Sequence, residues 1–120
     1  MKISEVADRT GLSVTTIRYY EKSGLCAAIA RGPDGKRRFS KNDLDWLTLL
    51  FSLRETGMPA AEMQDFAALY LKGSATIPER KARLAAHDRR LDERQAQLDR
   101  CKALLAYKLA RYAEIMGELA

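Results

Sequence analysis

The stretch SVTTIRYYEKSGL, residues 13–25, predicts a short helix with an unusual outer face. At about 3.6 residues per turn, Val14 and Ile17 share one side of this helix and are expected to face a core. The opposite side combines hydroxyls, a ring and positive charges, on Thr15, Thr16, Arg18, Tyr19 and Lys22. A face that only met water would need fewer rings, and a face packed in a core would need fewer hydroxyls. The pattern therefore indicates a surface that binds a partner.

A second helix is predicted directly before this one. Apolar residues at positions 3, 6 and 7 fall on one face of Ile3–Thr10, and Ser4 is a candidate N-cap. Gly11 can adopt the left-handed conformation that ends a helix, and Ser13 can cap the helix that follows. Two helices joined by a short glycine turn form a helix-turn-helix, whose second helix typically enters the major groove of DNA.

Residues 26–40, CAAIARGPDGKRRFS, predict a β-hairpin. The expected strands are 28–31 and 37–40, on either side of a Gly-Pro-Asp-Gly turn. Its edge is basic, with Arg31, Lys36, Arg37 and Arg38. Beside a helix-turn-helix, this pattern favours a wing that lies along DNA phosphates. The alternative is that the charged edge only prevents strands of different molecules from pairing.

Two further helices are expected to complete the N-terminal core. Ser40 and Asp43 form a capping-box pattern before a helix that ends near Glu55. Pro59 opens the next helix, which is expected to end near Lys72. Both helices carry apolar residues at three- and four-residue steps, so they need no ligand to explain their composition.

The C-terminal third predicts a long coiled-coil helix. An apolar residue recurs at every seventh position, at Ile77, Leu84, Leu91, Leu98, Leu105, Tyr112 and Leu119. Mostly charged residues and alanine separate them, so the stripe is narrow and is expected to pair with a copy from another chain. We therefore divide the chain into a DNA-binding domain at 1–72, a linker at 73–76 and a dimerisation helix at 77–120.

Charge and composition limit the class of protein. Residues 1–40 hold eight Lys and Arg against four acids, whereas residues 41–120 hold thirteen against twelve. The basic third suggests a polyanion as partner, although ordinary solubilising charge would give the same count. The chain shows neither an apolar run of about 18–20 residues nor a secretion signal, so a cytoplasmic protein is expected. Two distant cysteines without a CxxC motif fit a reducing compartment.

The order of these parts resembles the MerR family of bacterial transcription regulators over essentially the full chain. The resemblance is carried by ISEVADRTGLSVTTIRYYEKSGL, GKRRFS, NDLDWLTLLFSLRETGMP and the terminal helix, and the string Arg-Tyr-Tyr-Glu-x-x-Gly-Leu is its most specific part. It implies a mainly α fold, in which a winged helix-turn-helix precedes a long antiparallel coiled-coil dimerisation helix. It also implies a homodimer on a palindromic promoter element, which bends and untwists the DNA so that RNA polymerase can use a spacer of unfavourable length.

The resemblance also assigns roles to individual positions. On the recognition helix it implies DNA contacts from Thr15, Thr16, Arg18, Tyr19 and Tyr20. On the wing it implies contacts from Arg31, Lys36, Arg37 and Arg38. Arg54 begins a turn that would form a second wing, and Lys36 stands where tyrosine is common in the family. Tyr20 is equally well explained as a core ring with its hydroxyl at the surface. The residues expected to form the dimer interface are Leu84, Leu91, Leu98, Leu105 and Tyr112.

Sensing of an effector is the least determined feature. The chain ends with the coiled coil, so no separate effector domain is expected. Its Thr-Gly-Met-Pro turn resembles short members that sense aldehydes or other electrophiles through a cysteine, but Ser52 stands at that position. A serine hydroxyl, unlike a tuned thiol, has no accessible anionic form near neutral pH. Cys26 and Cys101 remain as candidate thiol sensors, with a small apolar filler as the simpler role for each. His87 is expected to be solvated, and no cofactor or metal site is predicted.

Three functions are compared on this basis. The first is a dimeric transcription regulator, whose partners are promoter DNA, a second copy, RNA polymerase and a small-molecule or electrophile effector. The second is an excisionase-like architectural factor that bends DNA, and the third is a coiled-coil adaptor that binds protein. An enzyme is not expected, because one histidine and no convergent acid, base or nucleophile make a catalytic site hard to build.

Overall fold

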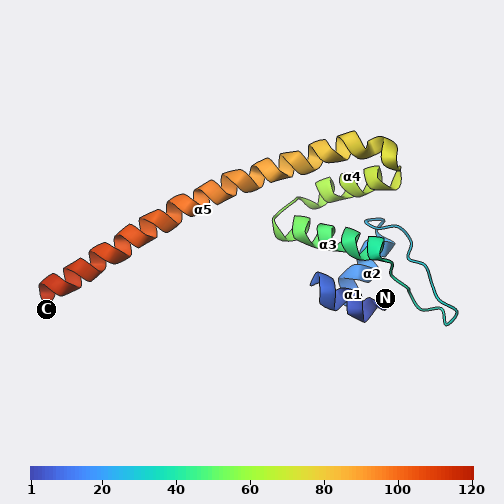
Figure 1. Cartoon of the computed structure of the whole chain (residues 1–120), viewed down its shortest axis with the longest axis horizontal. Coiled ribbons are helices and arrows are strands. Elements are labelled where there is room, and N and C mark those ends of the chain that lie inside the picture. Colours follow the sequence, from blue (N-terminus) through green and yellow to red (C-terminus); the bar gives the residue numbers. More distant parts are fainter. The chain divides into compact units, whose positions relative to one another are not determined.

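The computed structural model describes residues 1–120 and consists mainly of helices (Figure 1). The elements are α1 (Ile3–Thr10), α2 (Val14–Lys22), α3 (Lys41–Glu55), α4 (Ala60–Leu71), the short 3-10 helix η1 (Ser74–Thr76) and α5 (Ile77–Leu119). The chain divides into two compact units, Met1–Arg83 and Leu84–Ala120, so the first turns of α5 belong to the N-terminal unit. None of the helices combines the length and apolar character that crossing a bilayer requires.

The helix-turn-helix has the bounds that the sequence predicts. Gly11 ends α1 in the left-handed conformation, with φ at 84°, and its N–H donates to the Ala7 carbonyl. Ser13 caps α2, because its hydroxyl accepts the Thr16 N–H at 3.0 Å. The candidate cap at Ser4 is wrong, since α1 begins at Ile3 with Lys2 before it and without a side-chain cap. The Met1 amine donates to the Phe39 carbonyl, and the Phe39 N–H donates to the Met1 carbonyl, so the N-terminus is tied to the segment just before α3.

Gly11→Ala should destabilise the N-terminal unit by about 2 kcal/mol, because a left-handed backbone costs a side chain about 1–2 kcal/mol. A Cβ at this position would also lie 3.0 Å from Cζ of the Phe51 ring. Urea unfolding at a fixed protein concentration measures the change. Gly117→Ala is the matched control, since nothing lies within 4 Å of its added Cβ. A loss of stability in both variants alike would show that the turn at Gly11 is not strained by a side chain.

The helices α3 and α4 support the end of α2. The predicted capping box is confirmed, with the Ser40 hydroxyl accepting the Asp43 N–H and the Asp43 carboxylate accepting the Ser40 N–H. The indole of Trp46 stacks on Tyr70, with ring centroids 4.0 Å apart, and lies 5.4 Å from the ring of Phe66. Its N–H donates to the Leu25 carbonyl at 2.8 Å, just beyond α2. The aromatic stack therefore ties α3 and α4 to the recognition helix.

The wing, residues 28–39, differs from the predicted hairpin because it contains no strand. Its two sides pair at one isolated bridge, Arg31 with Arg37, and the Arg38 N–H donates to the Ala30 carbonyl. The ends of both sides are bonded elsewhere. The Ile29 N–H donates to the Glu21 carboxylate, and Phe39 pairs with Met1. Too few backbone groups are left to form a ladder between the two sides.

The long helix α5 contains 43 residues, which corresponds to about 65 Å at 1.5 Å per residue. Four residues of the predicted stripe are more than half exposed in the single chain, namely Leu98, Leu105, Tyr112 and Leu119. Leu84 and Leu91 are partly buried. The expectation that His87 is solvated is wrong, because only 3% of this residue is exposed. Its Nδ1 atom lies 3.0 Å from a guanidinium nitrogen of Arg90, so part of its polar capacity is met within the helix.

Candidate nucleic-acid interface

The outer face of α2 is built by burial of its inner face. Ile17 and Tyr20 are buried, and this places Thr15, Arg18 and Tyr19 at the surface, with Tyr19 60% exposed. Thr16 is partly buried, and its hydroxyl lies 2.8 Å from that of Ser13. The helix therefore presents an uncommitted hydroxyl, a guanidinium and a phenol, all of which can bond to bases or phosphates.

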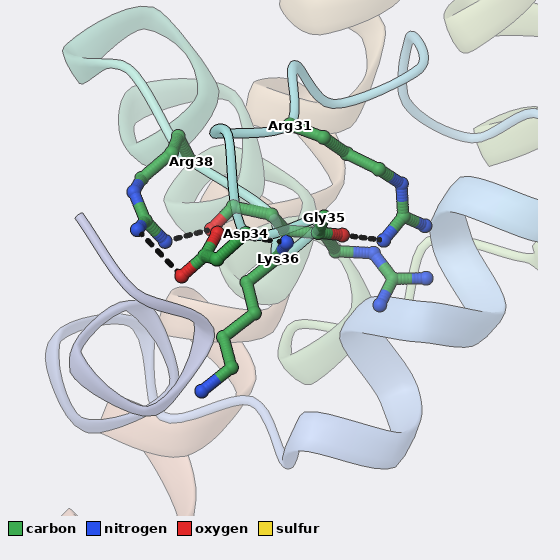
Figure 2. Close-up of polar contacts among 6 residues, drawn as sticks. Arg31, Asp34, Gly35, Lys36 and Arg38 are labelled. Carbon is green, nitrogen blue, oxygen red and sulfur yellow. Dashed lines mark hydrogen bonds and ion pairs between the residues drawn. The ribbon is translucent and has the colours of Figure 1, made fainter.

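The tip of the wing is held in shape by its own polar contacts (Figure 2). The Gly35 N–H donates to the Gly32 carbonyl, which closes a four-residue turn. One carboxylate oxygen of Asp34 accepts the Lys36 N–H at 3.0 Å, and the other accepts from Arg38 at 3.1 Å. The Arg31 guanidinium donates to the Gly35 carbonyl at 2.9 Å. These bonds give the tip a defined form while several positive charges stay at its surface.

Cationic side chains from three parts of the chain meet around one hollow of about 360 Å³. The hollow lies among the start of α1, helix α2 and the wing. Its basic residues, hereafter the basic cleft, are Lys2, Arg18, Arg31, Lys36, Arg37 and Arg38. Such a group of like charges attracts a polyanion and is weakened by salt. The sequence predicts a role for five of these residues, and it gives no signal for Lys2.

A second hollow, of about 510 Å³, borders a different side of α2 from the basic cleft. It brings Arg54, from the end of α3, to the same hollow as four residues of the recognition helix, Thr15, Thr16, Tyr19 and Tyr20. Met58 and Met63 contribute to its apolar wall. The predicted contacts thus fall into two groups, one around each hollow, and α2 lies between them.

Tyr20 lies in the core, which is the alternative that the sequence left open. Only 4% of the residue is exposed, and its hydroxyl is buried without a hydrogen-bond partner. The ring centroids of Tyr19 and Tyr20 are 6.4 Å apart, so two adjacent tyrosines point to different environments. In this conformation Tyr20 packs in the core beneath the recognition helix, and Tyr19 is the ring available to a partner.

Glu21 is the acid of the Arg-Tyr-Tyr-Glu string, but the sequence analysis gave it no role. One of its carboxylate oxygens accepts from Nε of Arg37 and the other from the Ile29 N–H, both at 2.8 Å. Burial by itself raises the pKa of this carboxyl, but the Ile29 bond and the Arg37 charge more than offset it, so the net pKa is lowered. The available signals were a lone acid within a basic segment and its place in the Arg-Tyr-Tyr-Glu-x-x-Gly-Leu string. The carboxylate is therefore charged at neutral pH and bound to both sides of the wing.

The two thiols lie in different environments, and Ser52 is exposed. Cys26 is buried, and burial raises the pKa of its thiol to about 11, with smaller contributions from the Glu21 and Asp43 carboxylates. Such a thiol carries almost no thiolate at neutral pH and is a poor nucleophile. Cys101 is exposed on α5.

A Cys101→Ser variant should therefore react very slowly with an aromatic disulfide reagent at about pH 7. Only about one Cys26 thiol in 10,000 would be ionised, and burial restricts access further. We expect labelling to be at least about 100-fold slower than in the same variant unfolded by guanidinium. Absorbance of the released thiolate measures both rates. Rapid labelling of the folded variant would make Cys26 a reactive thiol instead of a core residue.

An exposed recognition helix that borders both the basic cleft and the hollow containing Arg54 defines the class of this chain as a helix-turn-helix DNA-binding protein. The family model of the MerR HTH family regulatory protein matches residues 1–69, and that described as MerR, DNA binding matches residues 44–107. The chain belongs to the MerR family.

Individual relatives agree with this assignment. An uncharacterized HTH-type transcriptional regulator of Haemophilus influenzae is 38% identical over 97% of this chain and 87% of its own length. The HTH-type transcriptional regulator CueR of Salmonella typhimurium is 33% identical over 87% of this chain and 78% of its own. The structure of HiNmlR, described as a MerR family regulator lacking the sensor domain and bound to promoter DNA, superposes with a TM-score of 0.82. That match has 36% identity and covers 94% of this chain and 90% of HiNmlR.

The chain is thus a DNA-binding transcriptional regulator of the MerR type. Its families and relatives are transcriptional regulators and not enzymes, and they favour this role over that of an architectural factor.

Proposed function

We propose that this chain binds a palindromic promoter element as a homodimer and alters the geometry of that DNA to control transcription by RNA polymerase. The observation that carries the proposal is the placement of α2 between the basic cleft and the Arg54 hollow. A helix that lies in the major groove is flanked on each side by the phosphates that border the groove. Cations on both sides of α2 fit that arrangement.

The residues divide into three roles under this proposal. Thr15, Arg18 and Tyr19 face the groove, where the arginine can donate two bonds to guanine. Arg31, Lys36 and Arg38 lie along the phosphates on the wing side. Arg54 contacts the backbone on the other side, as part of a second wing at the turn between α3 and α4. Residues 1–72 would then form the DNA-binding domain, with a linker at 73–76.

Dimerisation is assigned to residues 77–120. Leu98, Leu105 and Tyr112 are more than half exposed in the single chain, and they lie on a stripe that repeats every seven residues. Apolar area of this kind is normally covered, and an antiparallel copy of the same helix covers it with matching residues. A twofold dimer presents two recognition helices and so favours a palindrome. The related HiNmlR structure, which is bound to promoter DNA, supports promoter DNA as the ligand of this chain.

Selection of bound duplexes from a random pool tests the proposal. We expect an inverted repeat, and we expect the logarithm of affinity for it to fall by about 0.9 per phosphate contact with the logarithm of salt concentration. DNA bending and transcription from a promoter carrying the repeat are then measured together. Recovery of sequence-blind, salt-labile binding alone would contradict the proposal, and bending without any effect on transcription would favour the architectural alternative.

An electrophile is the effector that this proposal retains, with Cys101 as the exposed thiol. Measuring both DNA binding and transcription from the selected promoter, with and without a small aldehyde, tests this part separately. We expect binding to be unchanged by the aldehyde but transcription to respond, and Cys101→Ser to remove the response. An equal response in Cys101→Ser would exclude this thiol as the sensor.

A further inference from the structure

We infer that Glu21 is a positioning residue, whose carboxylate fixes the direction of the wing relative to the recognition helix and so sets DNA specificity. Glu21 belongs to α2, eight positions before Ile29 and sixteen before Arg37. Its two oxygens bond one residue from each side of the wing, both at 2.8 Å. A single side chain thus joins the element that enters the groove to both sides of the element that lies along the phosphates.

The wing needs such a joint because its own structure is sparse. Its sides share one isolated bridge and no strand, so the bonds inside the wing do little to define its direction. The joint is also well shielded, since the exposed fractions of the Glu21 and Arg37 side chains are 16% and 21%. Water competes weakly for bonds in such a place, and bonds to a charged carboxylate are among the stronger ones.

The negative charge of Glu21 beside the basic cleft is unfavourable for DNA binding, so its presence there indicates another role. Glu21 bonds to Arg37, which lines the basic cleft, where a negative charge opposes DNA binding. The Glu21 carboxylate also occupies Nε of Arg37, so we assign Arg37 to holding the wing in position and not to binding phosphate. The phosphate contacts then fall to Arg31, Lys36 and Arg38. This goes beyond the general DNA-binding role and changes what removal of Glu21 should do.

A positioning role and a purely electrostatic role of Glu21 predict opposite changes in operator affinity for Glu21→Ala. If Glu21 contributed only charge, its removal would raise affinity for every duplex alike. If it positions the wing, affinity for the selected operator falls by about tenfold, in keeping with the strength of bonds to charged groups. Affinity for random duplex should rise or stay constant, and its salt slope should steepen by up to about 0.9 because Arg37 becomes free for a phosphate. Fluorescence anisotropy on both duplexes measures the ratio.

Two further variants separate positioning from general damage. Glu21→Gln keeps an oxygen for the Ile29 N–H but removes the ion pair, so it should recover part of the operator affinity lost in Glu21→Ala. Glu5→Gln removes an exposed acid that pairs with Arg9 at 4.0 Å on α1, and it should change both affinities less than about twofold. Thermal unfolding of each variant identifies any that fails to fold.

Amide hydrogen exchange at Ile29 tests the joint without any operator, so it is independent of the proposed promoter. We expect exchange to be at least about tenfold faster in Glu21→Ala and close to the unmodified rate in Glu21→Gln. An operator-to-random affinity ratio within twofold of the unmodified protein, or unchanged exchange at Ile29 in a folded Glu21→Ala variant, overturns the inference.

Discussion

Replacing Leu105 by glutamate should separate the two copies of the proposed dimer and remove operator binding with it. Leu105 is 56% exposed in the single chain and lies near the middle of the visible apolar stripe of α5. A symmetric dimer carries the change twice. Burying an unpaired polar group costs about 1–3 kcal/mol, so the total is about 4 kcal/mol, or about 1000-fold in the dissociation constant of the dimer. Sedimentation equilibrium over a concentration series measures this constant.

Ala103→Glu is the matched control for this experiment. It adds the same charge two residues away, which at about 100° per residue lies nearly on the opposite side of the helix. We expect its dimer dissociation constant to stay within about threefold of the unmodified value, since an exposed substitution changes stability little. If Leu105→Glu dimerises as well as Ala103→Glu, the seven-residue stripe is not the interface between the copies.

Arg18→Ala should weaken operator binding by about 30-fold and leave the dimer intact. Arg18 is exposed on α2 and lines the basic cleft, so its guanidinium is free to reach a base or a phosphate. A bidentate contact to a base contributes about 1–3 kcal/mol of discrimination, and about 2 kcal/mol corresponds to this loss. Gel mobility shifts on the operator and on single-base variants of it measure the effect.

Arg9→Ala controls for the loss of one positive charge. Arg9 is exposed on α1, pairs with Glu5 and lies outside the basic cleft, so its removal should cost less than about threefold. The two kinds of duplex distinguish what Arg18 contacts. A loss confined to the operator indicates a base, whereas an equal loss on random duplex indicates a phosphate. A loss below threefold on both would remove Arg18 from the interface.

The helices were predictable because their signals are local. Ser13, Gly11 and the Ser40–Asp43 capping box act on backbone groups within about one turn, and apolar spacing marks the buried face of each helix. The wing was not predictable in the same way. Its turn is local, but the amides that would have formed strands bond instead to Glu21 and Met1.

The sequence proposed a set of residues for the candidate interface, but it could not give their arrangement. Residue types on α2 and the wing indicated contact with a polyanion, and the family resemblance added Arg54. The packing of α3 and α4 against α2 decides whether Tyr20 faces outward. The same packing places Arg54 in a hollow shared with α2. Lys2 joins the basic cleft because the N-terminal backbone pairs with that of Phe39, a contact with no signal in either segment.

By itself, the sequence determined the order of the helices, the faces that they bury and the basic, hydroxyl-bearing surface of α2. These properties follow from the spacing and caps of neighbouring residues. Only the tertiary structure decided which charged side chains lie at the surface and which are bonded to other parts of the fold. That division depends on contacts between residues far apart in the chain, such as Glu21 with Arg37, sixteen positions away, and Trp46 with Leu25, twenty-one away. Each side chain's chemistry is set by its type, but its availability is set by the partner that folding brings to it.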